Sequence, residues 1–278
     1  MLFDRIVRDL SELNANLYGF AMWTEEEGLQ FHRFQPCTRC HNGYSVAKAF
    51  TTTAIGLLWD EGKLDTGDSL GDILHDPAWK NVTIEHALTH RIGYGQGHLD
   101  IDVEDVNAYP SQDYLQLALN FPRPHAPGSH FQYTDAGFYL LSRAVDHVCG
   151  EKMDSFLRER LIEPLRFQEI AWSRCPMDFP MGATGLYTGA EDNVKLSALY
   201  LNKGVWQGQR ILSEAWVDLV ETKNYELTPM SDTLRGKMGM YGQGIAYSRT
   251  HRAAFAWHAF DEKRHGLDVK RYLADLTL

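Results

Sequence analysis

The sequence is poor in cysteine, with four among 278 residues: Cys37, Cys40, Cys149 and Cys175. Four cysteines are too few to build a disulfide scaffold. The sequence has no run of about 18 apolar residues, the length that a membrane-spanning helix needs. Its first residues lack the apolar stretch and cleavage site of a signal peptide. We therefore expect no membrane span and a cytoplasmic location as written, or a periplasmic or extracellular one if a leader has been trimmed.

Positive charge is also in deficit, because 27 lysines and arginines face 37 aspartates and glutamates, a formal net charge of −10. An acidic surface repels phosphate backbones, so nucleic acid is not an expected partner. There is no internal repeat and no phosphate-cradling glycine loop. Apolar residues make up 44% of the chain, which is enough for a sizeable core in one large domain.

Two short patterns raise the question of a metal or cofactor. Cys37, Cys40 and His41 match the C-x-x-C-H pattern of haem attachment, but no second ligand pair lies at zinc spacing. Two reduced thiols near a strand end, a redox pair and haem remain as alternatives. His86 and His90 lie four residues apart on an expected helix, either as metal ligands or as structural histidines. We expect neither a cofactor nor a metal.

Strand patterns lie at both ends of the chain and helical patterns lie between them. The expected strands are Leu17–Thr24, Leu29–Phe34, Gly242–Tyr247, Ala253–His258 and Leu267–Val269. The expected helices include an N-terminal one, the apolar Ser45–Glu61, which should be buried on nearly every side, then Thr83–Thr89, Ser111–Asn120, Ala136–Val148, Met153–Leu161, Ala190–Asn202 and Ser213–Val220, with Ser213 as its cap. This order predicts an α+β fold: an antiparallel sheet from residues near 1–40 and 240–270, flanked by helices. A single domain would comprise an α/β subdomain, about 1–60 plus 205–278, and a helical insertion, about 61–204.

Ser45 and Lys48 are the first candidates for catalysis. Residues three apart on a helix share a face, so the hydroxyl and the amine would lie within reach of each other. Serine needs a base to become a nucleophile, and a lysine serves when its surroundings favour the neutral amine. An S-x-x-K pattern arises about once by chance in a chain of this length, so the alternative is a lysine that reaches solvent from a helix end.

Tyr133 and Asp135 follow a Pro127-Gly128 turn at a junction between a loop and a helix. A tyrosine beside an ammonium group can relay protons. The alternatives are a half-buried tyrosine with one hydrogen bond and an aspartate that caps the helix 136–148.

Taken together, Ser45-Val-Ala-Lys48 and Tyr133-Thr-Asp135 resemble the first two boxes of the serine β-lactamase and DD-peptidase superfamily, in its class C-like and esterase-like branch. The resemblance covers roughly residues 1 to 260. Its further segments are Thr83–His90, Tyr139–Arg143, Gly185–Asp192, Leu199–Asn202, Arg210–Ser213 and Tyr241–Gly244. It implies a β-lactamase/transpeptidase-like fold.

The third box of that superfamily is best matched by His258-Ala259-Phe260, with Lys237-Met238-Gly239 as an alternative. The resemblance implies that His258 supplies a polar or positive group, and that amides at Ser45 and around Phe260 form an oxyanion hole. Three features depart from the pattern. Asp135 stands where asparagine is frequent, Phe260 stands where glycine is usual, and the chain stops at Leu278, before the strands and long helix that usually follow. The early stop predicts an incompletely covered sheet face, and the alternatives are a natural short form, a truncated product or a homodimer that supplies the cover in trans.

The resemblance implies a penicillin-binding protein-like serine hydrolase that forms an acyl-enzyme at Ser45 on an ester, peptide or β-lactam substrate. Lys48 and Tyr133 would activate Ser45, and Asp135, His258 and Phe260 would contact the substrate or its oxyanion. The alternative is a module of the same fold that binds or senses such molecules and acylates slowly or not at all.

Overall fold

A computed structural model describes residues 2–13, 15–261 and 266–276. The chain forms two compact units, and each is interwoven from separate stretches of sequence. Unit 1 comprises residues 1–46, 162–171 and 186–278, and unit 2 comprises residues 47–161 and 172–185.

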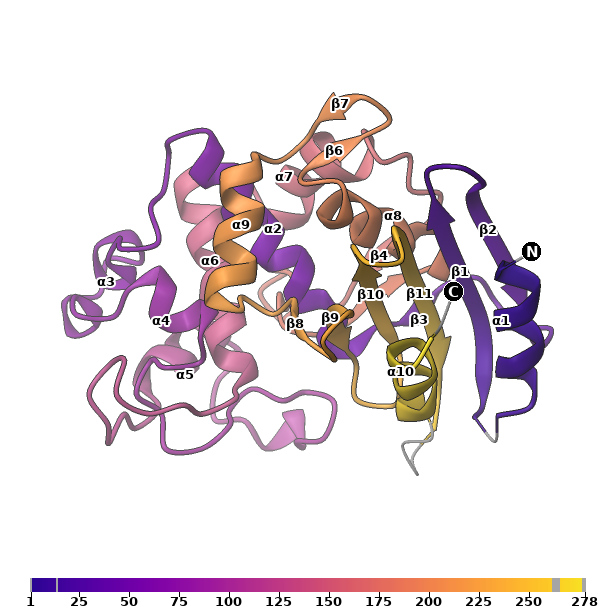
Figure 1. Cartoon of the computed structure of the whole chain (residues 1–278). Helices are drawn as coiled ribbons and strands as arrows, with labels where there is room; N and C mark the ends of the chain where they lie inside the picture. The colour runs from indigo at the N-terminus through magenta and orange to yellow at the C-terminus, as the bar shows by residue number, and fades with distance from the viewer. Residues whose placement is uncertain (1, 14, 262–265, 277–278) are drawn as a thin grey trace. The chain divides into compact units, whose positions relative to one another are not determined.

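Unit 1 is built on an antiparallel sheet in which two neighbouring strands come from opposite ends of the sequence (Figure 1). The strand order is β2-β1-β11-β10-β9-β8. The strands are β1 (Leu17–Thr24), β2 (Gly28–Arg33), β8 (Thr228–Pro229), β9 (Arg235–Met238), β10 (Gly244–Ser248) and β11 (Ala253–Ala259). β1 pairs with β11 from Thr24 opposite Ala253 to Leu17 opposite Ala259. The predicted sheet from both termini is confirmed.

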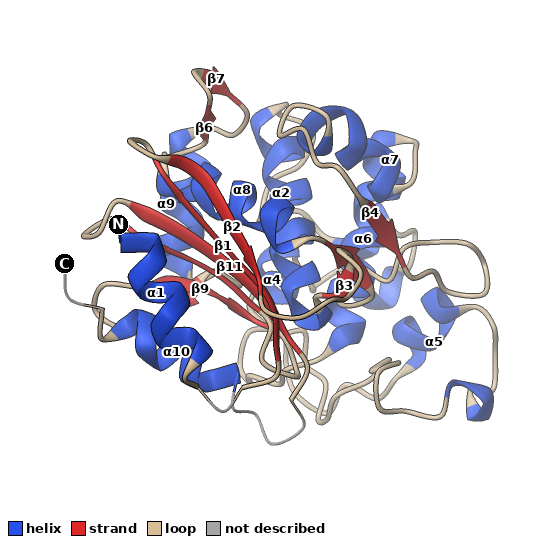
Figure 2. Ribbon diagram, turned by 90° about the vertical axis from the view of Figure 1, so that its right-hand side faces the viewer, coloured by secondary structure: helices blue, strands red, loops and turns tan. Residues whose placement is uncertain are grey.

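Side chains on β11 alternate between the two faces of the sheet, as the two-residue period of a strand requires. Phe255 and Trp257 join a core with Phe20 of β1. The helices α1 (Leu2–Ser11) and α10 (Gly266–Ala274) cover this face, whereas α8 (Ala190–Leu201) packs on the other (Figure 2). The sheet is therefore covered on both faces, contrary to the expectation of an exposed face.

The segment Leu267–Val269, expected as a strand, lies instead in α10. Its apolar positions recur at helical spacing, since Val269 and Leu273 are both buried against the sheet. The short stretch around residue 268 resembles a strand only when Leu273 is left out of the pattern.

Unit 1 is completed by short elements. One small sheet has the strand order β3 (His41–Asn42), β5 (Leu186–Thr188), β4 (Ile170–Trp172). A second small sheet pairs β6 (Val205–Trp206) with β7 (Gln209–Arg210). The helix α9 (Glu214–Lys223) begins after Ser213, whose hydroxyl accepts a hydrogen bond from the Trp216 amide, as predicted for a cap.

Unit 2 is helical and centres on two buried helices, α2 (Ala47–Asp60) and α6 (Asp135–Cys149), which pack against each other. α2 is apolar or small on nearly every side, and its residues from Ala47 to Leu58 are all buried, as predicted. The other helices are α3 (Leu70–Ile73), α4 (Ile84–Leu88), α5 (Tyr114–Asn120) and α7 (Met153–Leu157), with a π-helical turn at Arg158–Ile162.

The compact units divide at other positions than the ranges 1–60, 61–204 and 205–278 expected from the sequence. α2 belongs to the helical unit and α8 to the sheet unit. The sequence pattern placed α8 in the helical region, but α8 packs on the sheet of unit 1. Its polar residues are buried, and within the helix Lys195 pairs with Asp192 at 2.6 Å. No helix among the described residues is long and apolar enough to cross a membrane.

Candidate active site

Ser45 lies in a segment of unit 1 that is fixed by backbone hydrogen bonds. His41 pairs with Thr188, and the Gly43 amide donates to the Leu186 carbonyl at 2.8 Å. Tyr44 then adopts a φ of +49°, a left-handed conformation that is uncommon for a tyrosine. The Asn42 side-chain oxygen accepts a hydrogen bond from the Tyr44 amide at 2.8 Å and so stabilises this bend. Strained backbone of this kind concentrates at functional sites.

Ser45 itself is partly buried, in the 3₁₀ turn Tyr44–Val46 that leads directly into α2. The aromatic ring of Tyr44 packs edge-on against Tyr241, with ring centroids 5.0 Å apart. The turn therefore holds the serine hydroxyl close to the start of a helix, where the helix dipole favours negative charge.

Lys48 is fully buried in unit 2, with none of its side chain exposed. Its Nζ donates to Asp135 Oδ1 at 2.7 Å and to the Ala183 carbonyl at 3.0 Å. An ammonium ion taken out of water costs several kcal/mol unless a counter-charge and hydrogen bonds compensate, and Asp135 and Ala183 supply both. The alternative of a lysine that reaches solvent is therefore wrong.

Tyr133 lies just before α6 and is 39% exposed. Its ring centroid is 4.8 Å from Lys48 Nζ, within the range of a cation–π interaction. The buried ring of His90 packs against the Tyr133 ring, with the two ring centroids 4.4 Å apart. The structure thus brings together Lys48, Tyr133 and Asp135, three of the residues predicted from the sequence.

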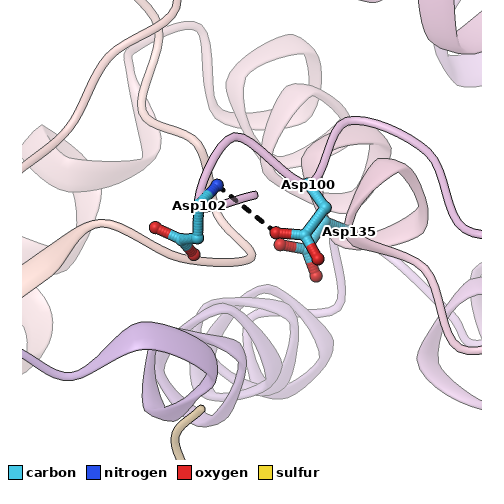
Figure 3. A group of neighbouring side chains, drawn as sticks. All are labelled: Asp100, Asp102 and Asp135. Carbon is cyan, nitrogen blue, oxygen red and sulfur yellow. Dashed lines mark hydrogen bonds between the residues drawn. The ribbon is translucent and has the colours of Figure 1, made fainter. Parts of the chain in front are cut away.

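Asp135 is the first residue of α6, and Thr134 occupies the capping position that the sequence suggested for Asp135. The Asp135 carboxylate therefore does not cap the helix and accepts a hydrogen bond from Lys48. Carboxylate oxygens of Asp100, Asp102 and Asp135 lie within 4.8 Å of one another (Figure 3). Burial and the neighbouring carboxylates raise the pKa of Asp100 to about 6, and burial raises the pKa of Asp102.

A hard divalent cation uses oxygen ligands of this kind. Here the Lys48 ammonium already supplies positive charge to Asp135, and Thr184 Oγ1 hydrogen-bonds to Asp102. The cluster is therefore partnered from within unit 2. Asp100 and Asp102 are not among the residues predicted from the sequence, although two aspartates that flank one isoleucine in a loop of mixed polarity were a visible signal.

His258 is buried on the α8 face of the sheet and is 1% exposed. Its Nε2 lies 3.3 Å from Asn193 Nδ2, and its ring centroid is 5.4 Å from that of His41. Burial, with a smaller contribution from His41, lowers the pKa of His258 to about 3. The buried surroundings favour the neutral imidazole, so of the polar or positive group that the resemblance implies, they favour the polar one.

Phe260 is 38% exposed, and its backbone is held by Asn16. The Phe260 amide donates to the Asn16 carbonyl at 3.1 Å, and the Asn16 side-chain amide donates to the Phe260 carbonyl at 3.0 Å. The next amide, of Asp261, donates to the Tyr241 carbonyl at 3.1 Å. The expected oxyanion donors around Phe260 are therefore engaged in this arrangement. In the alternative third box, the Lys237 ammonium is likewise engaged, in an ion pair with Glu226.

His86 and Cys40, two of the residues considered as metal, haem or redox groups, make hydrogen bonds within the fold. The His86 Nδ1 accepts a hydrogen bond from the Thr83 amide, which closes a capping box at the start of α4. The Cys40 thiol donates to Glu169 Oε2 at 3.2 Å, and burial together with this carboxylate raises its pKa to about 12. A thiol of this kind is a poor nucleophile, which disfavours a redox pair.

Residues 33–270 match the sequence model of the family named Beta-lactamase. The chain belongs to the Beta-lactamase family. Among curated members, PbpX of Bacillus subtilis (strain 168), named as a penicillin-binding protein, is 26% identical over 226 residues. That match covers 77% of this chain and 56% of PbpX, so the chain spans little more than half of that relative.

Solved structures agree with this Beta-lactamase family fold. A Bacillus anthracis protein described as a 6-aminohexanoate-dimer hydrolase has a TM-score of 0.79 at 16% identity, over 98% of this chain and 83% of its own. An octameric penicillin-binding protein homologue from Pyrococcus abyssi has a TM-score of 0.75 at 18% identity, over 98% and 75%. The predicted β-lactamase/transpeptidase-like fold is confirmed.

Proposed function

We propose that this protein is a serine hydrolase that forms an acyl-enzyme at Ser45. The observation that carries the proposal is the placement of Lys48. A lysine without solvent access directs its amine at a carboxylate and a tyrosine ring, three residues after a serine on a strained turn. Charged groups are seldom buried in this way unless they have a partner or a function, and the partner here is Asp135.

In the proposed reaction, Lys48 removes the proton from Ser45 and the hydroxyl oxygen attacks the carbonyl carbon of the substrate. The leaving group departs with a proton that passes through Lys48 or Tyr133. Water, activated at Tyr133, then releases the acyl group. The Ser45 amide is the remaining oxyanion donor of the predicted pair, because the Phe260 amide bonds to Asn16. No cofactor takes part.

The proposed substrate is a small ester, peptide or β-lactam. The names of the Bacillus anthracis and Bacillus subtilis relatives point to amide hydrolysis and penicillin binding, respectively. Asp135 would present a carboxylate, already paired with Lys48, where the related pattern has an amide side chain. This difference favours an ester or amide that does not rely on an asparagine for its orientation. A homodimer stays a prediction.

Covalent labelling tests the proposal directly. A fluorophosphonate probe and a fluorescent penicillin are incubated with the folded protein, and the modified peptide is identified by mass spectrometry. We expect adduct formation at Ser45 with at least one probe and none in Ser45→Ala. A panel of chromogenic esters, a cephalosporin and a D-Ala-D-Ala peptide then defines the substrate. If neither probe modifies Ser45 at any pH between 6 and 10, the hydrolase proposal is lost.

A second candidate, a binding or sensing module that acylates slowly, is favoured by the engagement of the Phe260 and Asp261 amides. Loss of one oxyanion donor slows acyl transfer by about 10²–10³-fold. Stoichiometric labelling at Ser45 without turnover of any ester would support this candidate over the hydrolase.

A further inference from the structure

The carboxylates around Lys48 outnumber its single positive charge. Asp135 contacts Nζ at 2.7 Å, and its oxygens lie within 4.8 Å of oxygens of Asp100 and Asp102. Asp100 and Asp102 also interact electrostatically with Lys48. These four residues belong to unit 2, in α2, in the loop before Val106–Ala108 and at the start of α6.

The hydrogen bonds of Lys48 favour its charged form. An ammonium donates three hydrogen bonds, and the carboxylate of Asp135 and the carbonyl of Ala183 both act as acceptors. The face of the Tyr133 ring adds a negative electrostatic surface 4.8 Å away. The Asp135 carboxylate, 2.7 Å from Nζ, stabilises a buried ammonium strongly, whereas burial alone would favour the neutral amine. A neutral amine is what the proposed activation of Ser45 requires.

We propose that Asp135, supported by Asp100 and Asp102, is a positioning residue that holds Lys48 as an ammonium ion and thereby sets an alkaline pH range for activation of Ser45. Lys48 must first release a proton to solvent before it accepts the proton of Ser45. This inference rests on the proposed function and extends it, since an asparagine at position 135 would hold the amine without stabilising its charge.

The charge balance of the cluster predicts how each carboxylate contributes. Asp135 acts directly, so its carboxylate has the largest effect on the ammonium. Asp100 carries a proton over part of the acidic range, because its pKa is about 6, and contributes its full charge only above that pH. Burial raises the pKa of Asp102, whereas the hydrogen bond from Thr184 favours its charged form. The acidic limb of the activity profile therefore depends mainly on Asp135 and to a smaller extent on Asp100 and Asp102.

The test measures the second-order rate constant for fluorophosphonate labelling of Ser45 between pH 6 and pH 11. In Asp135→Asn we expect the acidic limb of the profile to move to lower pH by at least about one unit. In Asp100→Asn and Asp102→Asn we expect shifts of about half a unit in the same direction. Asp135→Glu keeps the charge and is expected to keep the limb near that of the unmodified protein.

Asp105→Asn is the matched control. Asp105 is exposed in the same loop and accepts a hydrogen bond from the Asn107 amide, which an asparagine oxygen also accepts. Its profile is expected to be unchanged. Circular dichroism checks that each variant is folded, and if Asp135→Asn does not fold, Asp100→Asn and Asp102→Asn carry the test.

Titration of the Lys48 ε-carbon, followed by ¹³C NMR and assigned with Lys48→Arg, provides a readout that needs no activity. We expect the lysine to titrate at higher pH in the unmodified protein than in the variants that lack a carboxylate. Equal titration and equal acidic limbs would overturn the inference while the hydrolase proposal stands. A shifted titration without any labelling of Ser45 would leave the ammonium held as inferred and remove the proposed function.

Discussion

Lys48 and His258 are both almost completely buried, yet their partners favour opposite charge states. Lys48 has a carboxylate at 2.7 Å and is stabilised as an ammonium. His258 has an amide nitrogen and a second imidazole nearby, so burial lowers its pKa to about 3 and it stays neutral. Burial alone disfavours charge in both cases. The partner of each titratable group, rather than its depth in the core, therefore decides whether the charged form is favoured.

The largest expected effect comes from removing the charge of Lys48. Lys48→Met leaves Asp135 buried beside two other carboxylates, and removal of one partner of a buried ion pair costs about 3–5 kcal/mol. We expect a loss of this size in the free energy of unfolding, measured by urea denaturation at pH 8. The double variant Lys48→Met/Asp135→Asn should recover part of that loss. If the single variant were as stable as the unmodified protein, the ion pair would not be what keeps this charge buried.

The protonation state of His258 predicts a pH-dependent effect that is smaller than the Lys48 effect at any pH above about 5. Its pKa in the folded state, about 3, is below the ordinary value of 6.5, so between these values only the unfolded chain binds the proton. Stability should therefore fall as pH decreases from about 6.5 towards 3, by up to about 1.4 kcal/mol per pH unit from this group.

The measurement compares the unmodified protein with His258→Gln, whose amide can still meet Asn193. Urea denaturation at several pH values between 4 and 7 gives the two slopes. The variant is expected to lose less stability on acidification. Parallel slopes would mean that His258 accepts a proton in the folded protein, and the contrast with Lys48 would fail.

The smallest expected effect concerns Cys40, a third group whose partner is a carboxylate. Burial and Glu169 favour the neutral thiol, with a pKa of about 12. We expect iodoacetamide at pH 8 to modify Cys37 before Cys40, as measured by peptide mass spectrometry. Glu169→Gln should raise the reactivity of Cys40 several-fold with little change in stability. Faster modification of Cys40 in the unmodified protein would contradict the assignment.

Local patterns predicted most of the elements correctly. The buried helix after Ser45, the cap at Ser213 and the strand at Leu17–Thr24 depend on residues close to one another in the sequence. The same is true of Lys48 and Tyr133 as neighbours, although there the resemblance to a known family added the long-range pairing. Residues whose role is set by spacing and apolar periodicity are accessible to such reasoning.

What the sequence did not reveal was decided by distant partners. The Phe260 amide is engaged by Asn16, which is 244 residues away, and no local pattern indicates that contact. Asp100 and Asp102 acquire their significance only because α6 brings Asp135 to the same place. His258 resembled a cationic group by its position in a motif, but its charge depends on the side chains that α8 places against it.

The adjacency of β1 and β11 has a consequence for how the protein is made. Thr24 lies opposite Ala253, so this pair of neighbouring strands joins segments more than two hundred residues apart. During synthesis β1 emerges first and has only β2 as a partner until residues 253–259 leave the ribosome. Pairing over such a distance is slow, and an unpaired strand edge is prone to association with other chains. The first strand is therefore a natural binding segment for a chaperone during the long interval before its neighbour appears.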